Sequence, residues 1–320
     1  MARFMTRRRF FGYSAIGTTA ALVGCGYWMT RPPVAIAAAK AAPPPVSTNI
    51  SSRIRLHMFQ TGWVAVKTQH RAFDGPAGLR LPAIMASRSW TEWMPVTAFA
   101  VEHPEGLFVV DTGETARIAD PEYTACDGVT GMFYNNNLQF SLTANDEIGP
   151  QMDRAGLAPD RVSKVVMTHL HSDHMGGMGW FPNAEFLVSE AARNGHAGAL
   201  MCRIPSFVNM QAVRYTDRTS GVFSQSAALT DDGSISIVPT PGHANGHQSV
   251  IIEDEGKSVC IVGDAAFTLN QVMSGEIGGI VENHGAAVQS SKLLKTQFEQ
   301  FQTVLLPTHD LDNAERMTNL

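Results

Sequence analysis

The sequence predicts an α/β fold built of two stacked halves with helices on the outside. The order strands, helix, strands occurs twice along residues 53–320, which predicts the two halves. Four separate strand segments also end in a residue that can bind a metal ion, and such a number indicates strands that converge on one rim. We therefore expect one folded body over residues 53–320, with a functional site where these strands end.

Short apolar or alternating segments bounded by turn residues predict the strands of both halves. In chain order they are residues 54–59, 96–101, 107–110, 165–167, 184–188, 234–238, 249–252, 258–262 and 303–306. Helices are predicted at residues 148–157 and around 293–301, and a helix start is predicted at 189–193. Residues 68–95 contain several Gly and Pro and are expected to be irregular, and residues 114–147 hold no strong pattern.

An apolar strand runs into a dense group of metal-binding side chains at residues 168–177, THLHSDHMGG. Alternation along the strand end places His169 and His171 on one side, so that both imidazoles can reach one ion. Asp173 and His174 follow in the turn, where a second ion can bind nearby. Three histidines and an aspartate within six residues are costly to bury without metal. We interpret this segment as a metal site.

Three later strands end in the same way, each in a histidine or an aspartate next to a turn residue: His243, Asp264 and His309. A further strand ends in Asp111, followed by Thr and Gly. Such an aspartate is most often structural, but it can also orient a metal-bound histidine through a hydrogen bond. His196, in contrast, is interpreted as a surface residue and not as a ligand.

The charge balance argues against a nucleic-acid partner. The chain has 24 Lys and Arg against 29 Asp and Glu, a formal net charge of −5. Residues 1–50 contain six basic residues and no acidic ones, so the remainder is more acidic than the whole chain. An acidic body is poorly suited to binding a phosphate backbone.

Residues 1–52 are predicted to be an export signal and a tether, not part of the fold. The segment TRRRFF at 6–11 resembles the twin-arginine signal, and an uncharged stretch supplies its apolar middle. Residues 40–52, with three consecutive prolines, are typical of an extended tether. We expect export by the twin-arginine route.

Whether the exported protein is anchored to the membrane or released depends on the processing of its N-terminus at Cys25. The segment LVGC at 22–25 resembles the lipobox of bacterial lipoproteins, in which Cys25 is lipidated and anchors a periplasmic protein to the membrane. Cleavage near residues 35–39, which releases a soluble protein, and retention of the apolar stretch as an anchor are the alternatives. The only membrane association expected is through this N-terminal segment.

The other three cysteines do not indicate a catalytic or metal-binding site. Cys260 lies in a predicted core strand and is expected to be an inert apolar residue. A disulfide between Cys126 and Cys202 can form in an oxidising compartment, although the spacing gives no argument for it. No cysteine has the spacing of zinc-binding thiolates.

Together these motifs resemble the metallo-β-lactamase superfamily and, within it, the N-acyl-homoserine lactonases. The resemblance spans roughly residues 54–310 and rests on five pieces: VVDTG at 109–113, HLHSDHMGG at 169–177, TPGHANGH at 240–247, GDA at 263–265 and HD at 309–310. It implies an αββα sandwich, two stacked mixed β-sheets with helices on the outer faces. It also implies a dinuclear metal site, usually with two zinc ions.

The resemblance further implies how the ligands divide between the ions. The first ion would be held by His169, His171 and His243. The second would be held by Asp173, His174 and His309, with Asp264 as the bridge between the two. His247 matches a motif residue that is generally not a ligand, and it is given a supporting role with Asp111.

Imidazole and carboxylate ligands suit zinc, and two ions about 3.5–4 Å apart can hold a hydroxide between them at neutral pH. That hydroxide can attack a carbonyl carbon, so that no Ser or Cys nucleophile is needed. Asp173 is the best candidate to carry a proton to the leaving alkoxide, and Asp264 is catalytic as the bridging ligand. We therefore expect a zinc hydrolase that opens small-molecule lactones, with the N-acyl-homoserine lactones of quorum quenching as first candidates.

One position departs from the homoserine lactonases, which commonly carry a tyrosine three residues after the bridging aspartate. This sequence has Phe267 there, and phenylalanine cannot donate a hydrogen bond. Either another group such as Tyr134 takes over, or the substrate differs. Trp90 and Trp93 are expected either to form an apolar wall over the site or to fill the core.

Other functions remain open at this level. Phe267 also resembles the pattern of glyoxalase II, a thioesterase of the superfamily, but only eleven residues follow His309, too few for its helical substrate-binding region. A thioesterase, a carboxyl esterase or a β-lactamase are the alternatives among enzymes, although zinc β-lactamases usually lack the bridging aspartate. A non-catalytic metal-binding surface lipoprotein is the alternative from another class, and the complete ligand set argues against it.

Overall fold

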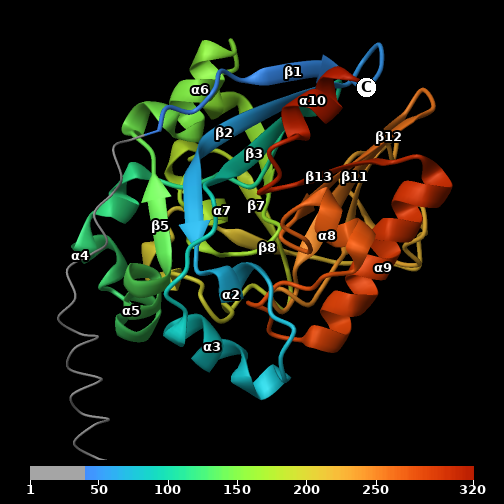
Figure 1. Cartoon of the computed structure of the whole chain (residues 1–320). Helices are drawn as coiled ribbons and strands as arrows, with labels where there is room; N and C mark the ends of the chain where they lie inside the picture. The colour runs from blue at the N-terminus through green and yellow to red at the C-terminus, as the bar shows by residue number, and fades with distance from the viewer. Residues whose placement is uncertain (1–39) are drawn as a thin grey trace, which may run out of the picture.

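Two β-sheets pack face to face, with helices on both outer sides (Figure 1). The computed structural model describes residues 40–320, so the predicted export signal and Cys25 lie outside the described residues. Both sheets are mixed, because each contains antiparallel pairs and at least one parallel pair. This architecture confirms the predicted αββα sandwich.

The first sheet contains eight strands in the order β1-β2-β3-β4-β6-β7-β8, with β5 paired to β2. Their bounds are β1 (Val46–Asn49), β2 (Arg55–Val66), β3 (Met94–His103), β4 (Gly106–Val110), β5 (Leu138–Ser141), β6 (Val162–Val166), β7 (Glu185–Ser189) and β8 (Met210–Val213). Strands β4, β6, β7 and β8 run parallel, so their C-terminal ends lie along one edge of the sheet.

The second sheet contains five strands in the order β13-β12-β11-β10-β9. Their bounds are β9 (Ala227–Ala228), β10 (Ile235–Pro239), β11 (Gln248–Asp254), β12 (Lys257–Gly263) and β13 (Val304–Pro307). Only β12 and β13 pair in parallel among these strands. The predicted strands before His243, Asp264 and His309 are therefore β10, β12 and β13.

The helices are short apart from α9. Their bounds are α2 (Thr68–Arg71), α3 (Arg80–Ala86), α4 (Pro121–Thr124), α5 (Gly128–Asn137), α6 (Ile148–Arg154), α7 (Ser172–Met175), α8 (Leu269–Ser274), α9 (His284–Phe301) and α10 (Asn313–Thr318). Among residues 40–320, each helix is too short or too polar to cross a lipid bilayer. In Figure 1, α8 and α9 lie outside the second sheet, and α2 and α3 lie beside the lower end of β2.

Strands buried on both faces explain why the sequence shows apolar runs as well as alternation. In β3, Phe99 and Val101 point into the core between the sheets, whereas Ala98 and Ala100 face the outer layer. The outer layers are completed by helices: α6 packs on the first sheet, and α8 and α9 pack on the second. Cys260 of β12 is buried and free, as expected for an apolar core position.

The N-terminal boundary differs from the prediction. The tether was expected to reach Ser52, but residues 46–49 form β1, which pairs antiparallel with β2. The hydroxyl of Ser47 also lies 2.8 Å from Nδ1 of His57. Because β2 would otherwise present an open edge, this segment adds a strand to the sheet instead of crossing solvent.

Two regions without a clear pattern contain elements that form the site. Residues 68–95 hold α2 and α3, and residues 114–147 hold α4, α5 and β5. The α5 sequence GVTGMFYNNN is rich in poor helix formers, so contacts with neighbouring elements, not propensity, stabilise it. The predicted helix start at residues 189–193 is wrong, because that segment forms turns that end at Gly195, with φ 89°.

A disulfide joins Cys126, just before α5, to Cys202, and its two cysteines are 76 positions apart. The pairing that the sequence left open is therefore present in the structure.

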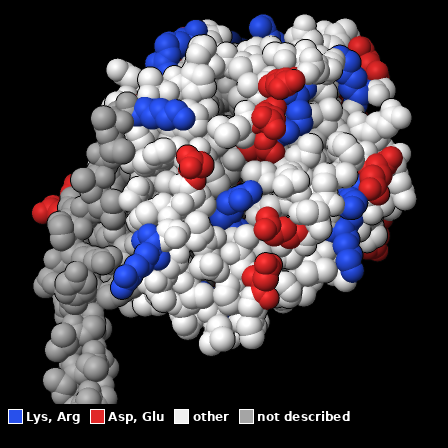
Figure 2. Space-filling view, viewed as in Figure 1, with Lys and Arg blue, Asp and Glu red and all other residues white. Residues whose placement is uncertain are grey.

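On the face shown in Figure 2, basic and acidic side chains are interspersed, without a broad area of one sign among the described residues.

Candidate metal centre and active site

The ends of four strands bring the predicted ligands together at one edge of the sandwich. The segment after β6 supplies four of them, and β10, β12 and β13 supply one each. The ligand atoms form two groups, and within each group they lie within 4.8 Å of one another. The first group is His169, His171, His243 and Asp264, and the second is Asp173, His174 and His309.

In the first group, three imidazole nitrogens converge on one point. Nε2 of His169 lies 2.9 Å from Nδ1 of His171, and that atom lies 3.0 Å from Nε2 of His243. The carboxylate of Asp264 is 3.5 Å from the same nitrogen of His243. A tetrahedral zinc ion with ligands at about 2.0–2.1 Å separates its ligand atoms by about 3.3 Å. The spacing therefore fits one divalent ion.

The second group has the same spacing and shares Asp264 with the first. Nε2 of His309 lies 3.3 Å from Oδ2 of Asp264 and 3.5 Å from Oδ2 of Asp173. Nε2 of His174 lies 3.4 Å from the other Asp264 oxygen, Oδ1. The carboxylate of Asp264 thus reaches both groups, which is the geometry required of a bridging ligand.

Hydrogen bonds on the far side of three rings fix which nitrogen faces the centre. Nε2 of His171 donates to the carbonyl of Ala197 at 3.1 Å, and Nδ1 of His309 donates to the carbonyl of Pro95 at 2.7 Å. Nδ1 of His174 lies 2.8 Å from Oδ2 of Asp111. Carbonyl and carboxylate oxygens only accept, so the lone pair of each ring is on the nitrogen that faces the cluster.

Two atoms at the centre are buried and make no hydrogen bond within residues 40–320: Nε2 of His174 and Oδ1 of Asp264. Burial of such atoms costs about 1–3 kcal/mol each unless they find a partner. An ion between the two groups would satisfy both. The donor set, the fixed ring orientations and these two atoms together fit a pair of divalent metal ions.

The electrostatics favour the neutral, metal-binding form of the histidines in the first group and the protonated form of those in the second. Burial lowers the pKa of His169 and His171 well below the usual value, and it lowers the pKa of His243 to about 4, so these rings are neutral. Burial also opposes a charge on His174, but Asp264, Asp111 and Asp173 raise its pKa well above the usual value. Metal binding at the second group is therefore coupled to proton release.

Asp111 and His247 lie directly behind the ligands. The Asp111 carboxylate accepts hydrogen bonds from the backbone N and the hydroxyl of Thr168, both at 2.7 Å, besides that from His174. Nε2 of His247 accepts from the backbone N of Asp264 at 3.0 Å. A side chain at Gly263, whose φ is 65°, would place its Cβ 2.7 Å from that nitrogen, so glycine is required there.

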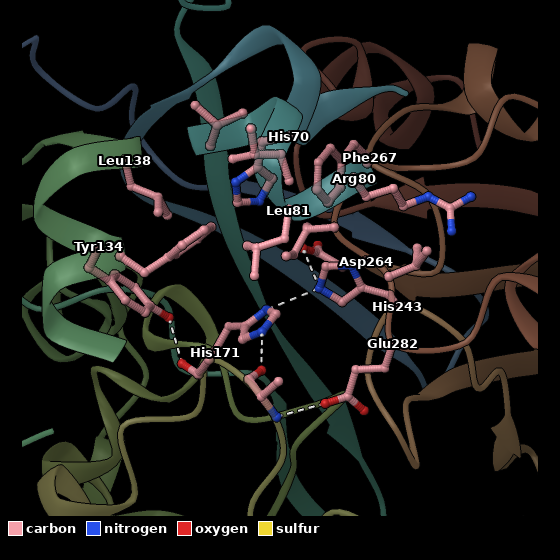
Figure 3. Close-up of a pocket in the computed structure, with 18 of the residues that line it drawn as sticks. His70, Arg80, Leu81, Tyr134, Leu138, His171, His243, Asp264, Phe267 and Glu282 are labelled. Atoms are coloured by element: carbon pink, nitrogen blue, oxygen red, sulfur yellow. Dashed lines mark hydrogen bonds and ion pairs between the residues drawn. The ribbon is translucent and has the colours of Figure 1, made fainter. Parts of the chain in front are cut away.

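A cavity of about 590 Å³ opens above the two groups. Its floor is polar and includes five members of the cluster: His171, Asp173, His243, Asp264 and His309. Its walls are largely apolar and come from β2, α3, α5 and the loop at 279–281. Figure 3 shows His171, His243 and Asp264 at the floor, with Tyr134 and Leu138 on one wall and Phe267 on the opposite one.

Two of the residues predicted to contact substrate, Phe267 and Tyr134, line the cavity, but the hydroxyl of Tyr134 is hydrogen-bonded within the protein. Phe267 lines the cavity, with its ring 5.1 Å from that of His309 between centroids. Tyr134 also lines it, but its hydroxyl donates to the carbonyl of Gly198 at 3.0 Å and accepts from the backbone N of Ser172 at 3.1 Å (Figure 3). The Tyr134 hydroxyl is therefore engaged within the protein and is not available to replace the tyrosine missing at 267.

The two tryptophans do not line this cavity. The ring of Trp90 packs under the ammonium group of Lys67 at 3.8 Å, and Trp93 lines a separate cavity that reaches the other side of His309. The expectation of an apolar tryptophan wall over the site is wrong, because α3 and α5 occupy that place.

Two histidines near the centre had no signal in the sequence. His196 is only partly exposed, not a surface residue as expected, and its Nε2 accepts a hydrogen bond from the backbone N of Leu170 at 2.8 Å. His70 of α2 is buried in the cavity wall. Each is a lone histidine in an irregular stretch, so only the fold reveals its position.

Comparison with known proteins agrees with this geometry. The model of the metallo-beta-lactamase superfamily matches residues 91–309. N-acyl homoserine lactonase AttM of Rhizobium radiobacter is 26% identical over 274 residues, which cover 81% of this chain and 94% of that protein.

Solved structures show the same fold. An N-acyl homoserine lactone hydrolase with the product N-hexanoyl-L-homoserine bound at the catalytic metal center has a TM-score of 0.64 at 21% identity, over 81% of this chain and 94% of that one. AidC, a dizinc quorum-quenching lactonase, has a TM-score of 0.56 at 14% identity, over 84% and 91%.

Proposed function

Because the chain belongs to the metallo-beta-lactamase superfamily, we propose that it is a dinuclear zinc hydrolase that opens lactone rings, with N-acyl-homoserine lactones as its substrates. One observation carries the proposal: seven metal-binding side chains gather in two groups, and five of them form the floor of a cavity whose walls are largely apolar. The relationship to AttM, a lactonase that is 26% identical, supports the substrate class.

In this proposal each group would hold one ion, and the carboxylate of Asp264 would be shared between them. His169, His171 and His243 would hold the first ion, and Asp173, His174 and His309 would hold the second. Imidazole and carboxylate donors suit zinc. When bound, the two ions would supply an activated water and polarise the carbonyl of the substrate.

The protein's own groups then move the proton. Water adds to the lactone carbonyl carbon, the ring C–O bond breaks, and the leaving ring oxygen needs a proton to become a hydroxyl. Asp173 lies on the cavity floor, so its carboxylate can take the proton from the attacking water and pass it to the ring oxygen. The product is the open-chain hydroxy acid.

The cavity also supports a substrate with an apolar chain. The floor has room for a polar ring against the ligands, and Val64, Ile84 and Phe133 on the walls offer apolar surface to an acyl group. Most small-molecule sites combine apolar walls with a few polar groups in this way.

A substrate panel tests the proposal. Acyl-homoserine lactones of several chain lengths, a β-lactam and a thioester are incubated with the full chain, and the products are identified by mass. We expect ring-opened acyl-homoserine from the lactones at a much higher rate than from the other classes. A thioester or β-lactam preference, or no lactone turnover at any chain length, would contradict the substrate assignment. The His169→Ala, His171→Ala double variant is the control for metal-dependent turnover.

We also propose that the protein is exported by the twin-arginine route and is periplasmic or anchored through Cys25. The disulfide between Cys126 and Cys202 supports an oxidising compartment. The mass of the mature N-terminus tests this proposal. A lipidated Cys25 would support anchoring, cleavage near residues 35–39 would support release, and an intact N-terminus in the cytoplasm would contradict export.

A further inference from the structure

His70 is a buried histidine on the wall of the cavity, outside the seven predicted ligands. It is 7% exposed and comes from α2, which follows β2. Its ring lies between two aromatic rings, with centroids 6.0 Å from Phe133 and 6.4 Å from Phe267. Figure 3 shows it on the cavity wall beside Phe267. Its position places it next to any molecule held above the floor.

The Nδ1 atom of His70 is buried and makes no hydrogen bond with any described residue. Native proteins pair nearly all buried polar side-chain atoms, and an unpaired one costs about 1–3 kcal/mol. A leucine would fill a place between two phenylalanine rings without that penalty. The other ring nitrogen, Nε2, also has no hydrogen-bond partner among the described residues but is not among the buried atoms, and His70 lines the cavity, so Nε2 is the nitrogen that a molecule in the cavity can reach.

The backbone around His70 is held firmly. Its carbonyl accepts hydrogen bonds from the backbone N of Gly279 at 2.9 Å and of Ile280 at 3.2 Å. A Cβ at Gly279 would lie 1.8 Å from the carbonyl oxygen of Gln69, so the loop can approach α2 only with glycine there. The imidazole is therefore presented by fixed backbone, not by a mobile loop.

Hydrogen bonds of the Gln271 side chain also connect α2 to the segment that contains Phe267. The side chain of Gln271 donates to the carbonyl of Arg71 at 3.1 Å and accepts from the backbone N of Phe267 at 2.8 Å. The rings of His70 and Phe267 thus keep a fixed relation to each other and to Asp264, three residues before Phe267.

Tyr134 and Phe267, the two aromatic residues predicted to contact substrate that line the cavity, do not offer the same bond. The Tyr134 hydroxyl is engaged with Gly198 and Ser172, and Phe267 has no polar atom. Burial lowers the pKa of His70 to about 3, so its ring is neutral and carries one N–H donor and one acceptor nitrogen.

We propose that His70 binds the substrate through a hydrogen bond from its imidazole, beside Phe267, which has no polar atom to make such a bond. This inference rests on the proposed lactone-opening function. His70 is a substrate-binding residue, and its hydrogen bond orients the ring of the lactone over the metal centre. Such a bond strengthens binding only of substrates that carry a polar group next to the reacting ester.

Two substitutions in the full chain separate a hydrogen bond from packing. His70→Leu keeps the apolar bulk and removes both nitrogens, whereas His70→Gln places an amide near the position of Nε2. We expect His70→Leu to lower kcat/KM for the lactone by about tenfold or more, because the bond is lost. We expect His70→Gln to retain activity within about threefold of the wild type, because a donor remains.

Stability and metal content provide a readout that a structural role would not give. Since His70→Leu removes a buried atom without a partner, its Tm should equal or exceed that of the wild type, with two metal ions retained. The matched control is His57→Leu, at a buried histidine outside the cavity whose ring contacts Ser47 and Glu102, and its kcat/KM should stay within about threefold.

The inference is overturned if His70→Leu keeps wild-type kcat/KM, if the Leu and Gln variants lose activity equally, or if activity falls only together with Tm. A wild-type protein that opens no lactone would instead contradict the proposed function. The two failures are distinct, because only the second appears before any substitution is made.

Discussion

Replacing Asp111 by Asn should loosen one of the two ions without touching a ligand. Asp111 has a positive φ of 57° and accepts hydrogen bonds through both carboxylate oxygens. Oδ1 accepts from the backbone N of Thr168, and Oδ2 accepts from the Thr168 hydroxyl and from Nδ1 of His174. An asparagine has only one accepting atom for these donors.

The size of the effect follows from that mismatch. If the amide oxygen keeps its bond to the backbone N of Thr168, the amide NH₂ faces the N–H of His174. The ring must then rotate, or move its proton to Nε2, the nitrogen that faces Asp264. Loss of a carboxylate behind a metal-bound histidine typically lowers metal affinity about 10- to 100-fold. We expect that loss mainly for the ion of the His174 group, because in the other group His171 is oriented by a backbone carbonyl and His169 contacts Asp111 only through the hydroxyl of Thr168.

Competition with a chromophoric zinc chelator measures both affinities. The control is Glu102→Gln, which alters another carboxylate–imidazole contact of 2.8 Å, to His57, outside the metal cluster. Asp111→Asn should weaken one step of the titration, and Glu102→Gln should change neither. Two unchanged affinities in Asp111→Asn would refute the role of Asp111, and equal weakening of both steps would refute the division of the ligands.

Three further predictions concern the frame of the site. Cys126→Ser opens a link between positions 76 apart, so urea unfolding should show a loss of about 4 kcal/mol, and an unchanged midpoint would contradict a stabilising disulfide. Burial raises the pKa of Glu114 from 4.5 to about 8, so this carboxyl increasingly opposes folding as the pH rises between these values. Glu114→Gln should therefore stabilise the protein by up to about 3 kcal/mol at pH 7 and by little at pH 4.5, and a gain independent of pH would count against this explanation. His196→Phe removes the acceptor for the buried backbone N of Leu170 and should cost about 1–3 kcal/mol in the same assay, whereas wild-type stability would show that this bond contributes nothing.

Much of the fold was predictable because the strands are short apolar segments that end in recognisable turns. The hairpin of β3 and β4 and the strands before His243, Asp264 and His309 follow from such patterns. Their convergence on one edge was predictable too, since four strand ends with metal-binding residues are not a chance arrangement. The pattern could not reveal α5, whose glycines and asparagines favour turns until neighbouring elements hold the helix in place.

The centre of the site was visible in the sequence, but its walls were not. The spacing of His169 and His171 along the chain predicts a metal site. His70 and His196 are single histidines, and only their contacts with distant segments show that they lie near the site. Trp90 and Trp93 were expected either at the wall or in the core, because they lie in a long irregular segment and such segments often line sites. Trp90 instead pairs with Lys67, an interaction between a cation and a ring that no local pattern predicts.

Reconstitution of the metal-free protein with zinc tests the central claim most directly. The metal is removed by a chelator, zinc is added back in steps, and the rate of ring opening of an acyl-homoserine lactone is recorded at each step. The arrangement of seven ligands in two groups predicts a rate that is negligible at first and rises until two ions are bound per chain. Full lactone hydrolysis by the metal-free protein would contradict it.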